Sequence, residues 1–336
     1  MHFVCRGNVY RGRLAETYLK SKGLSGVSIS SSGLEADKVS EADKLKLPAL
    51  IATLLGLKSW QNFSCRQTTQ NLLDSADLII FMNADIALDA EARFKYIADK
   101  TETWNILNLD EALLKSNVIS TDEKAVDNLI LRTYAKIHTY ADRLTRDIVL
   151  SGIIDVVDAG NKLLGYSIPL AWTDRKGLWH RSCHGVIVTH DNKIVTEKRS
   201  HEIVFSPDLL DVSFGGGIDS GEDPELAPRR EAKEELGITI KDAEIIDLGI
   251  RKVNRYYPSK KLYSKFFLYS YLVKLPKQDL SISPQLSEVK EVYLISFRQI
   301  ARLVKFHRLA RFGRLTTSYV YYRDIMAKVR EHIKAR

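Results

Sequence analysis

The sequence has few cysteines and no long apolar segment. Its three cysteines, Cys5, Cys65 and Cys183, have no metal-finger spacing and cannot all pair within the chain. No apolar run approaches the length of a membrane span, and the N-terminus lacks the basic-then-apolar pattern of a signal peptide. Repeats and low-complexity segments are also absent. We therefore expect a protein of the reducing cytoplasm that has no membrane partner.

Length and charge point to two units with different surfaces. At 336 residues, with 45% hydrophobic and 27% charged residues, the chain has a globular composition and room for two domains. Residues 1–150 hold 19 basic and 19 acidic residues, which leaves 31 of the 50 basic and 23 of the 42 acidic residues for the rest. A basic second half is consistent with an anionic substrate, although solubility alone also accounts for a basic surface.

The N-terminal residues predict a strand, a glycine-containing loop and a helix. Residues 1–4 form the strand, the loop runs from Cys5 to Gly12, and a helical pattern begins at Arg13. This geometry directs backbone N–H groups and a helix N-terminus at an anion. It would favour the Cys5 thiolate as a nucleophile, and Arg11 would bind a phosphoryl group. The alternative is a buried structural cysteine at the end of a strand.

The residues around this loop resemble the low-molecular-weight protein tyrosine phosphatase family. The matches are Phe3-Val4-Cys5-x-Gly7-Asn8, Ala15-Glu16, Ser31-Ser32-Gly33, Cys65-Arg66-Gln67-Thr68 and residues 72–82. The resemblance implies that Cys5 is the nucleophile and that Asp110 is the general acid. It also implies phosphate binding by Gly7, Asn8 and Arg11. We expect a doubly wound parallel sheet, with strands at 76–82 and 104–109 and a long helix at 123–150.

Three positions depart from that family's pattern. Gly12 replaces a Ser or Thr that would hydrogen-bond the thiolate, Tyr10 replaces a second loop cysteine, and no proline follows Asp110. These departures argue against a phosphotyrosine side chain as the substrate, and the isolated Cys65 argues against an arsenate reductase. They leave open whether the domain is an active phosphatase or a degenerate one used for phosphate binding or interaction.

The second half contains a glycine loop followed by a glutamate-rich helix. The pattern is Gly216, five residues, Glu222, seven residues and then Arg230-Glu231-Ala232-Lys233-Glu234-Glu235-Leu236-Gly237-Ile238. We expect the helix over residues 224–236, with Asp223 as its N-cap and Gly237 as its stop. The last three glutamates are spaced i, i+3 and i+4, so they share one helical face and repel unless a cation lies between them. Carboxylate oxygens suit Mg²⁺ or Mn²⁺, whereas a solvated acidic face is the alternative.

Two further residues extend this predicted metal site. Glu222 would return over the same helical face, and Arg230 would hold one carboxylate bidentately. At these residues the chain resembles the Nudix hydrolase family. The run Leu178-Trp179-His180-Arg181 resembles the Nudix subgroup related to isopentenyl diphosphate isomerase, but residues 211–217 lack the cysteine that an isomerase would need.

The Nudix resemblance implies an α/β/α sandwich with a mixed sheet over residues 153–336, preceded by the phosphatase-like domain at 1–152. It also implies metal-dependent hydrolysis of a nucleoside diphosphate linked to another group, with a metal-held water as the nucleophile. The implied metal ligands are Glu222, Glu231, Glu234 and Glu235. Gly216 and Arg230 would contact the substrate, and Glu288 is the candidate base or extra ligand beside the catalytic Glu234 and Glu235.

Three functional hypotheses follow. The chain is a bifunctional enzyme with both chemistries, a Nudix hydrolase with a degenerate first domain, or a non-enzymatic nucleotide sensor. The expected partner is a small phosphorylated molecule, a nucleotide derivative, and a homodimer is an open alternative. Residues 302–330 carry basic side chains interleaved with tyrosines, which could bind nucleic acid, but a solvated helix with inward tyrosines is favoured.

Overall fold

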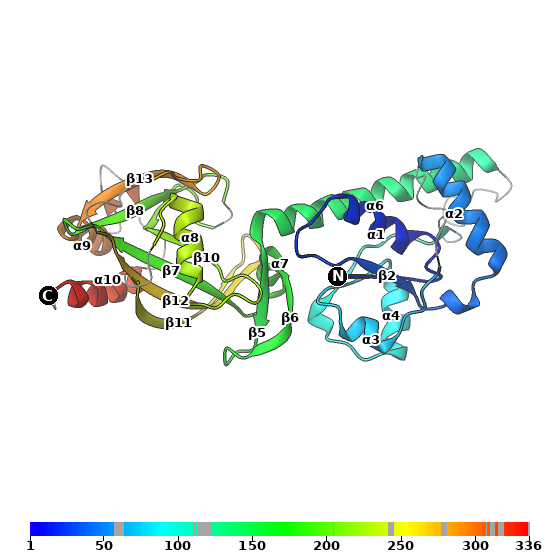
Figure 1. Cartoon of the computed structure of the whole chain (residues 1–336), viewed down its shortest axis with the longest axis horizontal. Helices are drawn as coiled ribbons and strands as arrows, with labels where there is room; N and C mark the ends of the chain where they lie inside the picture. The colour runs from blue at the N-terminus through cyan, green and yellow to red at the C-terminus, as the bar shows by residue number, and fades with distance from the viewer. Residues whose placement is uncertain are drawn as a thin grey trace. The chain divides into compact units, whose positions relative to one another are not determined.

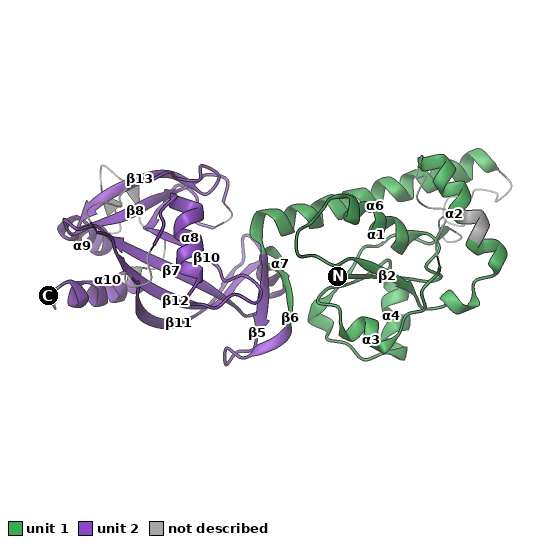
Figure 2. Cartoon of the chain, in the orientation of Figure 1, with its two compact units in different colours: residues 1–152, 166–172 green, residues 153–165, 173–336 purple. Residues whose placement is uncertain are grey.

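The computed structural model describes residues 1–56, 64–109, 112, 122–203, 205–240, 245–276, 281–306, 308–309, 313–314 and 319–334. The chain divides into two compact units (Figure 2). Unit 1 comprises Met1–Gly152 and Tyr166–Trp172, and unit 2 comprises Ile153–Gly165 and Thr173–Arg336. Among the helices in the described ranges, none is long and apolar enough to cross a membrane.

Unit 1 is built on a four-stranded parallel sheet (Figure 1). In spatial order the strands are β2 (Ser30–Gly33), β1 (His2–Cys5), β3 (Ile79–Phe81) and β4 (Thr101–Thr103). All the pairings are parallel. The apolar side chains of β1 are fully buried, Phe3 and Val4 among them, so this strand lies at the centre of the core. The predicted doubly wound parallel sheet is confirmed.

Helices connect these strands. They are α1 (Arg11–Ser21), α2 (Glu41–Leu55), α3 (Gln70–Asp74), α4 (Ala84–Arg93) and α6 (Glu123–Ser151), with 3₁₀ turns η1 (Ala36–Lys38) and η3 (Ala98–Lys100). Side-chain oxygens of Ser40, Thr69, Asn83 and Asp122 cap the N-termini of α2, α3, α4 and α6. The bounds of α6 agree with the helix predicted at 123–150.

Two predictions for unit 1 were wrong. The first helix begins at Arg11 rather than at Arg13, so the predicted phosphate-binding arginine lies in its first turn. The strand predicted at 104–109 lies instead at Thr101–Thr103. The apolar side chains that suggested a strand pack into the core, where the buried ring of Trp104 stacks on Tyr140 with the ring centroids 5.4 Å apart.

Unit 2 is built on a seven-stranded mixed sheet. Its strands are β7 (His180–Val188), β8 (Lys193–Arg199), β9 (Leu210–Val212), β10 (Phe214–Gly217), β11 (Ile245–Tyr257), β12 (Leu262–Lys274) and β13 (Val289–Ser296). The order is β11, β12, β7, β8, β13, with β10 beside β7 and β9 beside β8. β12 and β7 are parallel, and the other pairs are antiparallel.

Helices cover both faces of this sheet (Figure 1). α8 (Ala227–Leu236) packs on one face through Ala232 and Leu236, and α9 (Phe297–Phe306) and α10 (Tyr319–Lys334) pack on the other. The predicted α/β/α sandwich is therefore confirmed. The remaining elements are β5 (Ile153–Val157), β6 (Leu163–Pro169), α7 (Leu170–Lys176), β14 (Arg308–Leu309) and β15 (Gly313–Arg314).

The glutamate-rich helix is shorter than predicted. It begins at Ala227, and the residues before it form a turn in which Leu226 N–H donates to the Asp223 carbonyl at 2.8 Å. Asp223 is therefore not the N-cap, and its carboxylate accepts instead from Glu225 N–H at 3.0 Å. Gly237 ends the helix in the left-handed conformation, with φ of 69°, as predicted.

Candidate active sites

The cysteine loop of unit 1 is held in place by Asn8. Asn8 adopts a left-handed conformation with φ of 55°, and its side chain is buried. The Asn8 amide donates to Ser31 Oγ at 2.8 Å, and its carbonyl oxygen accepts from Arg66 N–H at 2.9 Å. Gly33 lets β2 approach the loop, because an added Cβ there would lie 2.6 Å from the Asn8 nitrogen. Asn8 thus fixes the shape of the loop.

The Cys5 thiol lies at the end of β1, with the residue 2% exposed. Cys5 Sγ lies 3.7 Å from the Ser32 carbonyl, to which the thiol donates. An added Cβ at Gly12 would lie 3.2 Å from that sulfur. The side chain of a Ser or Thr at position 12 would therefore lie directly against the thiol. With Gly12, this position places no hydroxyl group beside Cys5 Sγ.

Arg11 lies in the first turn of α1 and is 2% exposed. Its Nη1 donates to the Ile106 carbonyl at 2.7 Å, in the segment that follows β4. The loop and this segment therefore meet at the carboxyl end of the sheet, where ligands bind in open α/β sheets. The predicted acid, Asp110, lies outside the described residues.

In unit 2, two glycines let α8 approach strand β10. An added Cβ at Gly216 would lie 2.3 Å from Glu231 Oε1, and one at Gly215 would lie 2.7 Å from the His184 ring. Gly215 N–H donates to Glu235 Oε2 at 3.1 Å. The predicted substrate residue Gly216 therefore makes room for a buried carboxylate, which any larger residue would displace.

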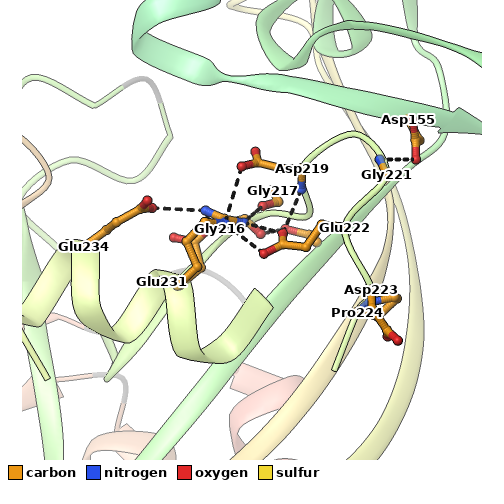
Figure 3. Close-up of polar contacts among 12 residues, drawn as sticks. Asp155, Gly216, Gly217, Asp219, Gly221, Glu222, Asp223, Pro224, Glu231 and Glu234 are labelled. Atoms are coloured by element: carbon orange, nitrogen blue, oxygen red, sulfur yellow. Dashed lines mark hydrogen bonds and ion pairs between the residues drawn. The ribbon is translucent and has the colours of Figure 1, made fainter. Parts of the chain in front are cut away.

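Arg230 donates hydrogen bonds to the glutamates of the loop and helix. Figure 3 labels three of these glutamates, Glu222, Glu231 and Glu234. Arg230 binds Glu222 bidentately, with Nε and Nη2 donating at 3.0 and 2.8 Å. Its Nη1 donates to Glu231 at 2.8 Å and to Glu234 at 3.0 Å. Burial lowers the pKa of Arg230, but the hydrogen bonds with Glu222 and the charges of Glu231 and Asp219 outweigh it and raise this pKa above its ordinary value. One guanidinium thus occupies the space between three predicted metal ligands.

The three helical glutamates differ in burial. Glu231 and Glu235 face the sheet, with 6% and 3% of the residue exposed, whereas the Glu234 side chain is 52% exposed. Burial raises the pKa of Glu231 from 4.5 to about 7, because it outweighs the stabilising charge of Arg230. Burial, and then repulsion from Glu197, raises the pKa of Glu235 well above its ordinary value.

Glu197, which sequence reasoning missed, completes this cluster from strand β8. It is 3% exposed, and its Oε2 has no hydrogen-bond partner among the described residues. Burial and the neighbouring Asp211 raise its pKa, although Arg199 Nη1 lies 3.5 Å from its other oxygen. The available signal was strand alternation, since Glu197 shares a strand face with the buried Val195.

Glu288 reaches the same cluster from the turn before β13. Burial raises its pKa, whereas the charge of Arg199 and an interaction with the carboxyl group of Glu235 oppose that rise. Its carbonyl accepts from Ser200 N–H at 2.7 Å, which ties this turn to the end of β8. The structure therefore brings the predicted base Glu288 to the glutamates of α8.

The two histidines of β7 are engaged in protein contacts. His180 is buried and lies 3.1 Å from Thr173 Oγ1. His184 contacts the Tyr321 hydroxyl at 2.7 Å and Asp211 Oδ1 at 3.1 Å. Both histidines are thus accounted for without a metal.

The donor atoms of the acidic cluster, carboxylate oxygens, are of the type that binds a divalent cation. Within the described ranges no group of three His, Cys, Asp or Glu residues is arranged to hold a metal ion, and Arg230 lies among the ligands instead. However, Glu197 and Glu231 both raise the pKa of the buried Glu235, and one buried Glu197 oxygen is without a partner among the described residues. Hard oxygen donors that repel one another are the donor set that Mg²⁺ or Mn²⁺ prefers.

Comparison with known proteins identifies unit 2. Residues 179–313 match the family model described as NUDIX domain. Over 154 residues the chain is 30% identical to an uncharacterized Nudix hydrolase of Clostridium acetobutylicum, covering 45% of this chain and 73% of that protein. The chain belongs to the Nudix hydrolase family. A solved structure from Deinococcus radiodurans is similar to this Nudix hydrolase, with 23% identity and a TM-score of 0.38 over 53% of this chain and 98% of that one.

The first half of this Nudix hydrolase matches a second family. Residues 1–118 match the model described as low molecular weight phosphotyrosine protein phosphatase. The structure of a YwlE mutant from Bacillus subtilis is similar, with 20% identity and a TM-score of 0.32 over 43% of this chain and 97% of that one. The two halves of the chain thus match the models of two different hydrolase families, and the predicted hydrolase is confirmed. Nudix hydrolases generally use divalent metal ions.

Proposed function

We propose that unit 2 cleaves the pyrophosphate bond of a nucleoside diphosphate linked to another group, with Mg²⁺ or Mn²⁺ as cofactor. One observation carries this proposal: four carboxyl groups from three separate parts of the chain converge in a cluster that is largely withdrawn from water. They are Glu197, Glu231, Glu235 and Glu288. Their mutual repulsion favours a bound cation, and the Nudix family membership supports the reaction.

The proposed ligands are the three helical glutamates together with Glu197. When bound, the metal supplies positive charge to the phosphate oxygens and acidifies a water molecule. Glu288 is the proposed base, because its pKa is raised and it lies against Glu235 at the edge of the cluster. Both carboxylate oxygens of Glu222 accept hydrogen bonds from Arg230, and one of them also accepts from Asp219 N–H at 2.9 Å. We therefore propose that Glu222 positions Arg230. Its contact with the metal stays a prediction.

We further propose that unit 1 removes a phosphomonoester. Cys5 Sγ would attack phosphorus, forming a P–S bond as the P–O bond to the leaving alcohol breaks. The alcohol would take its proton from the predicted acid Asp110, and water would then hydrolyse the P–S bond. Arg11 would hold the phosphate oxygens after leaving its contact with the Ile106 carbonyl.

A second candidate function for unit 1 is phosphate binding without turnover. The observation that favours it is the glycine at position 12, whose position against Cys5 Sγ leaves the thiol without the neighbouring hydroxyl that the family carries. In that case unit 2 is the single active domain of the chain.

The test of unit 2 is phosphate release from a panel of nucleoside diphosphate derivatives, with Mg²⁺, Mn²⁺ or a chelator. We expect metal-dependent release by the wild type and a loss of at least about 100-fold in Glu235→Gln, since the cation that Glu235 would help to hold contributes several kcal/mol to stabilising the transition state. Glu225→Gln is the matched control, because Glu225 is exposed in the loop before α8. Equal rates in both variants would refute the proposed role of the cluster.

The test of unit 1 is hydrolysis of an aryl phosphate in the presence of a chelator. We expect Cys5→Ser to abolish turnover and Cys65→Ser, a change at a half-buried free cysteine, to retain it. Equal rates for the wild type and Cys5→Ser would leave only the binding function for this unit.

A further inference from the structure

The β11–β12 hairpin carries a concentration of cations and aromatic rings. The 27 residues from Leu248 to Lys274 include seven Lys or Arg, seven Tyr or Phe, and no Asp or Glu. The cations are Arg251, Lys252, Arg255, Lys260, Lys261, Lys265 and Lys274. This segment therefore accounts for most of the net charge of +8 on the chain.

One face of the hairpin alternates rings with cations. The register pairs Tyr256 with Tyr263, Asn254 with Lys265 and Lys252 with Phe267, and side chains opposite one another lie on the same face. The Tyr256 and Tyr263 rings lie 4.7 Å apart between centroids, and Lys265 Nζ lies 5.1 Å from the Tyr263 centroid. Tyr256 is 50% exposed. This outer part of the face is thus open to solvent.

The inner part of the same face is used by the fold. Lys252 Nζ lies 4.5 Å from the centroid of the Trp179 ring, which contacts Phe267 with centroids 5.3 Å apart, and it donates to the Ala159 carbonyl. An added Cβ at Gly177 would lie 3.0 Å from the Tyr263 ring. These contacts fix one side of the hairpin, so its rings are presented from a rigid support.

We propose that this face binds a single-stranded nucleic acid. The exposed ring of Tyr256 and the half-buried ring of Tyr263, both beside cations, supply the two contacts that a single strand needs, stacking for the bases and charge for the phosphates. An acidic peptide would use the cations but not the rings, and the bases of a duplex are already stacked on one another. We therefore favour a single-stranded nucleic acid over an acidic peptide or a duplex, because aromatic rings and positive charges lie together on this face.

A second copy of the chain is a poor occupant for this edge. β11 is the terminal strand of the sheet, and pairing it with the β11 of another copy would bring Arg251, Lys252 and Arg255 against like charges. Cations on an edge strand also serve simply to prevent such pairing. A role limited to edge protection predicts no dependence of binding on the tyrosines, which the experiment below measures.

The experiment uses the full chain, a chelator and fluorescence anisotropy with a labelled single-stranded 12-nucleotide oligouridylate, over about 50–200 mM salt. We expect saturable binding that Tyr256→Ala with Tyr263→Ala weakens by about 10-fold or more, because stacking contributes that much per base. Lys261→Asn with Lys265→Gln should weaken binding and lower the slope of log affinity against log salt by about 1.4, for two lost phosphate contacts.

The matched control is Arg302→Gln with Lys305→Gln, two exposed cations on α9, which changes the net charge equally and should alter binding by less than about 2-fold. Circular dichroism confirms folding, and metal-dependent hydrolysis of the best small substrate should be unchanged in the hairpin variants. The absence of binding at low salt would overturn the proposal. Two other results would also overturn it. The tyrosine variant and the wild type would bind the oligonucleotide with equal affinity, or heparin would displace the oligonucleotide equally well from both. Either result would indicate a surface that binds any polyanion.

Discussion

Replacement of Glu231 by Gln should stabilise unit 2 in the absence of metal. Glu231 is buried, and its carboxylate lies between Arg230 and the other acidic groups of the cluster. Gln keeps the oxygen that accepts from Arg230 but removes the charge that burial disfavours. The substitution therefore separates the electrostatic cost of burying the Glu231 charge without metal from any effect of side-chain shape.

The magnitude follows from the pKa of Glu231, which is raised from 4.5 to about 7. Since one pKa unit corresponds to about 1.4 kcal/mol, the ionised form costs up to about 3 kcal/mol of folding free energy. The unfolded chain loses its proton first as pH rises, so the cost develops between pH 4.5 and about 7 and is complete above that range. Below pH 4.5 the group is protonated in both states and contributes no difference.

The assay is differential scanning calorimetry of the full chain with a chelator, between about pH 4 and about pH 8.5, which brackets the range in which the cost develops. The transition assigned to unit 2 is the one that divalent metal displaces. At the upper pH we expect Glu231→Gln to raise its midpoint by roughly 2–4 °C per kcal/mol, so by up to about 10 °C, and to converge with the wild type at the lower pH. With metal present the order should reverse, because the variant binds the cation less well.

Glu225→Gln controls for the loss of one acidic charge, because Glu225 is exposed. A Glu231→Gln variant that is less stable than the wild type at the upper pH, or equally displaced at every pH, would refute the reasoning. Either result would mean that Arg230 compensates the Glu231 charge fully in the folded state.

Three further substitutions test the geometry of the sites. Gly216→Ala would place a methyl group 2.3 Å from the Glu231 carboxylate, and we expect the metal-dependent rate to fall at least about 10-fold while circular dichroism stays unchanged. Arg230→Lys loses the bidentate contact with Glu222, and thermal unfolding should show a loss of about 1.5–3 kcal/mol. Gly12→Ser would add a hydroxyl beside the loop thiol, and an increase in chelator-resistant aryl phosphate hydrolysis would support the active-phosphatase hypothesis, whereas no change would favour the binding function.

Local features of both sites were predictable from the sequence. The spacing of Glu231, Glu234 and Glu235 placed them on one side of α8, because helical periodicity depends only on neighbouring residues. Gly237 ended that helix in the left-handed conformation, and the long α6 followed from its apolar pattern. The bounds were less predictable. The sequence predicted Pro224 as the first helical residue, but the helix begins at Ala227. The reason is that residues 223–226 form a separate turn, closed by the hydrogen bond from Leu226 N–H to the Asp223 carbonyl.

The tertiary structure alone decided how the carboxylates meet. Glu197 lies on β8 and Glu288 before β13, and no local pattern brings either of them to Glu235. Their convergence requires the antiparallel pairing of β8 with β13 and the close approach of α8 to β10, which depends on Gly216. The raised pKa values have the same origin, since burial is a property of the packed chain and not of residue order.

Packing also determined which contacts some side chains make, because the motifs did not specify those contacts. Arg11 was predictable as the arginine of a phosphate loop, but its contact with the Ile106 carbonyl exists only because β1 and β4 belong to one sheet. The apolar run around Trp104 likewise suggested a strand, whereas its side chains fill the core beside the sheet. Sequence by itself determined most of the candidate residues of both sites, through short-range spacing, but not Glu197. Long-range pairing and burial determined which of them meet, because those interactions join residues that are distant in the chain.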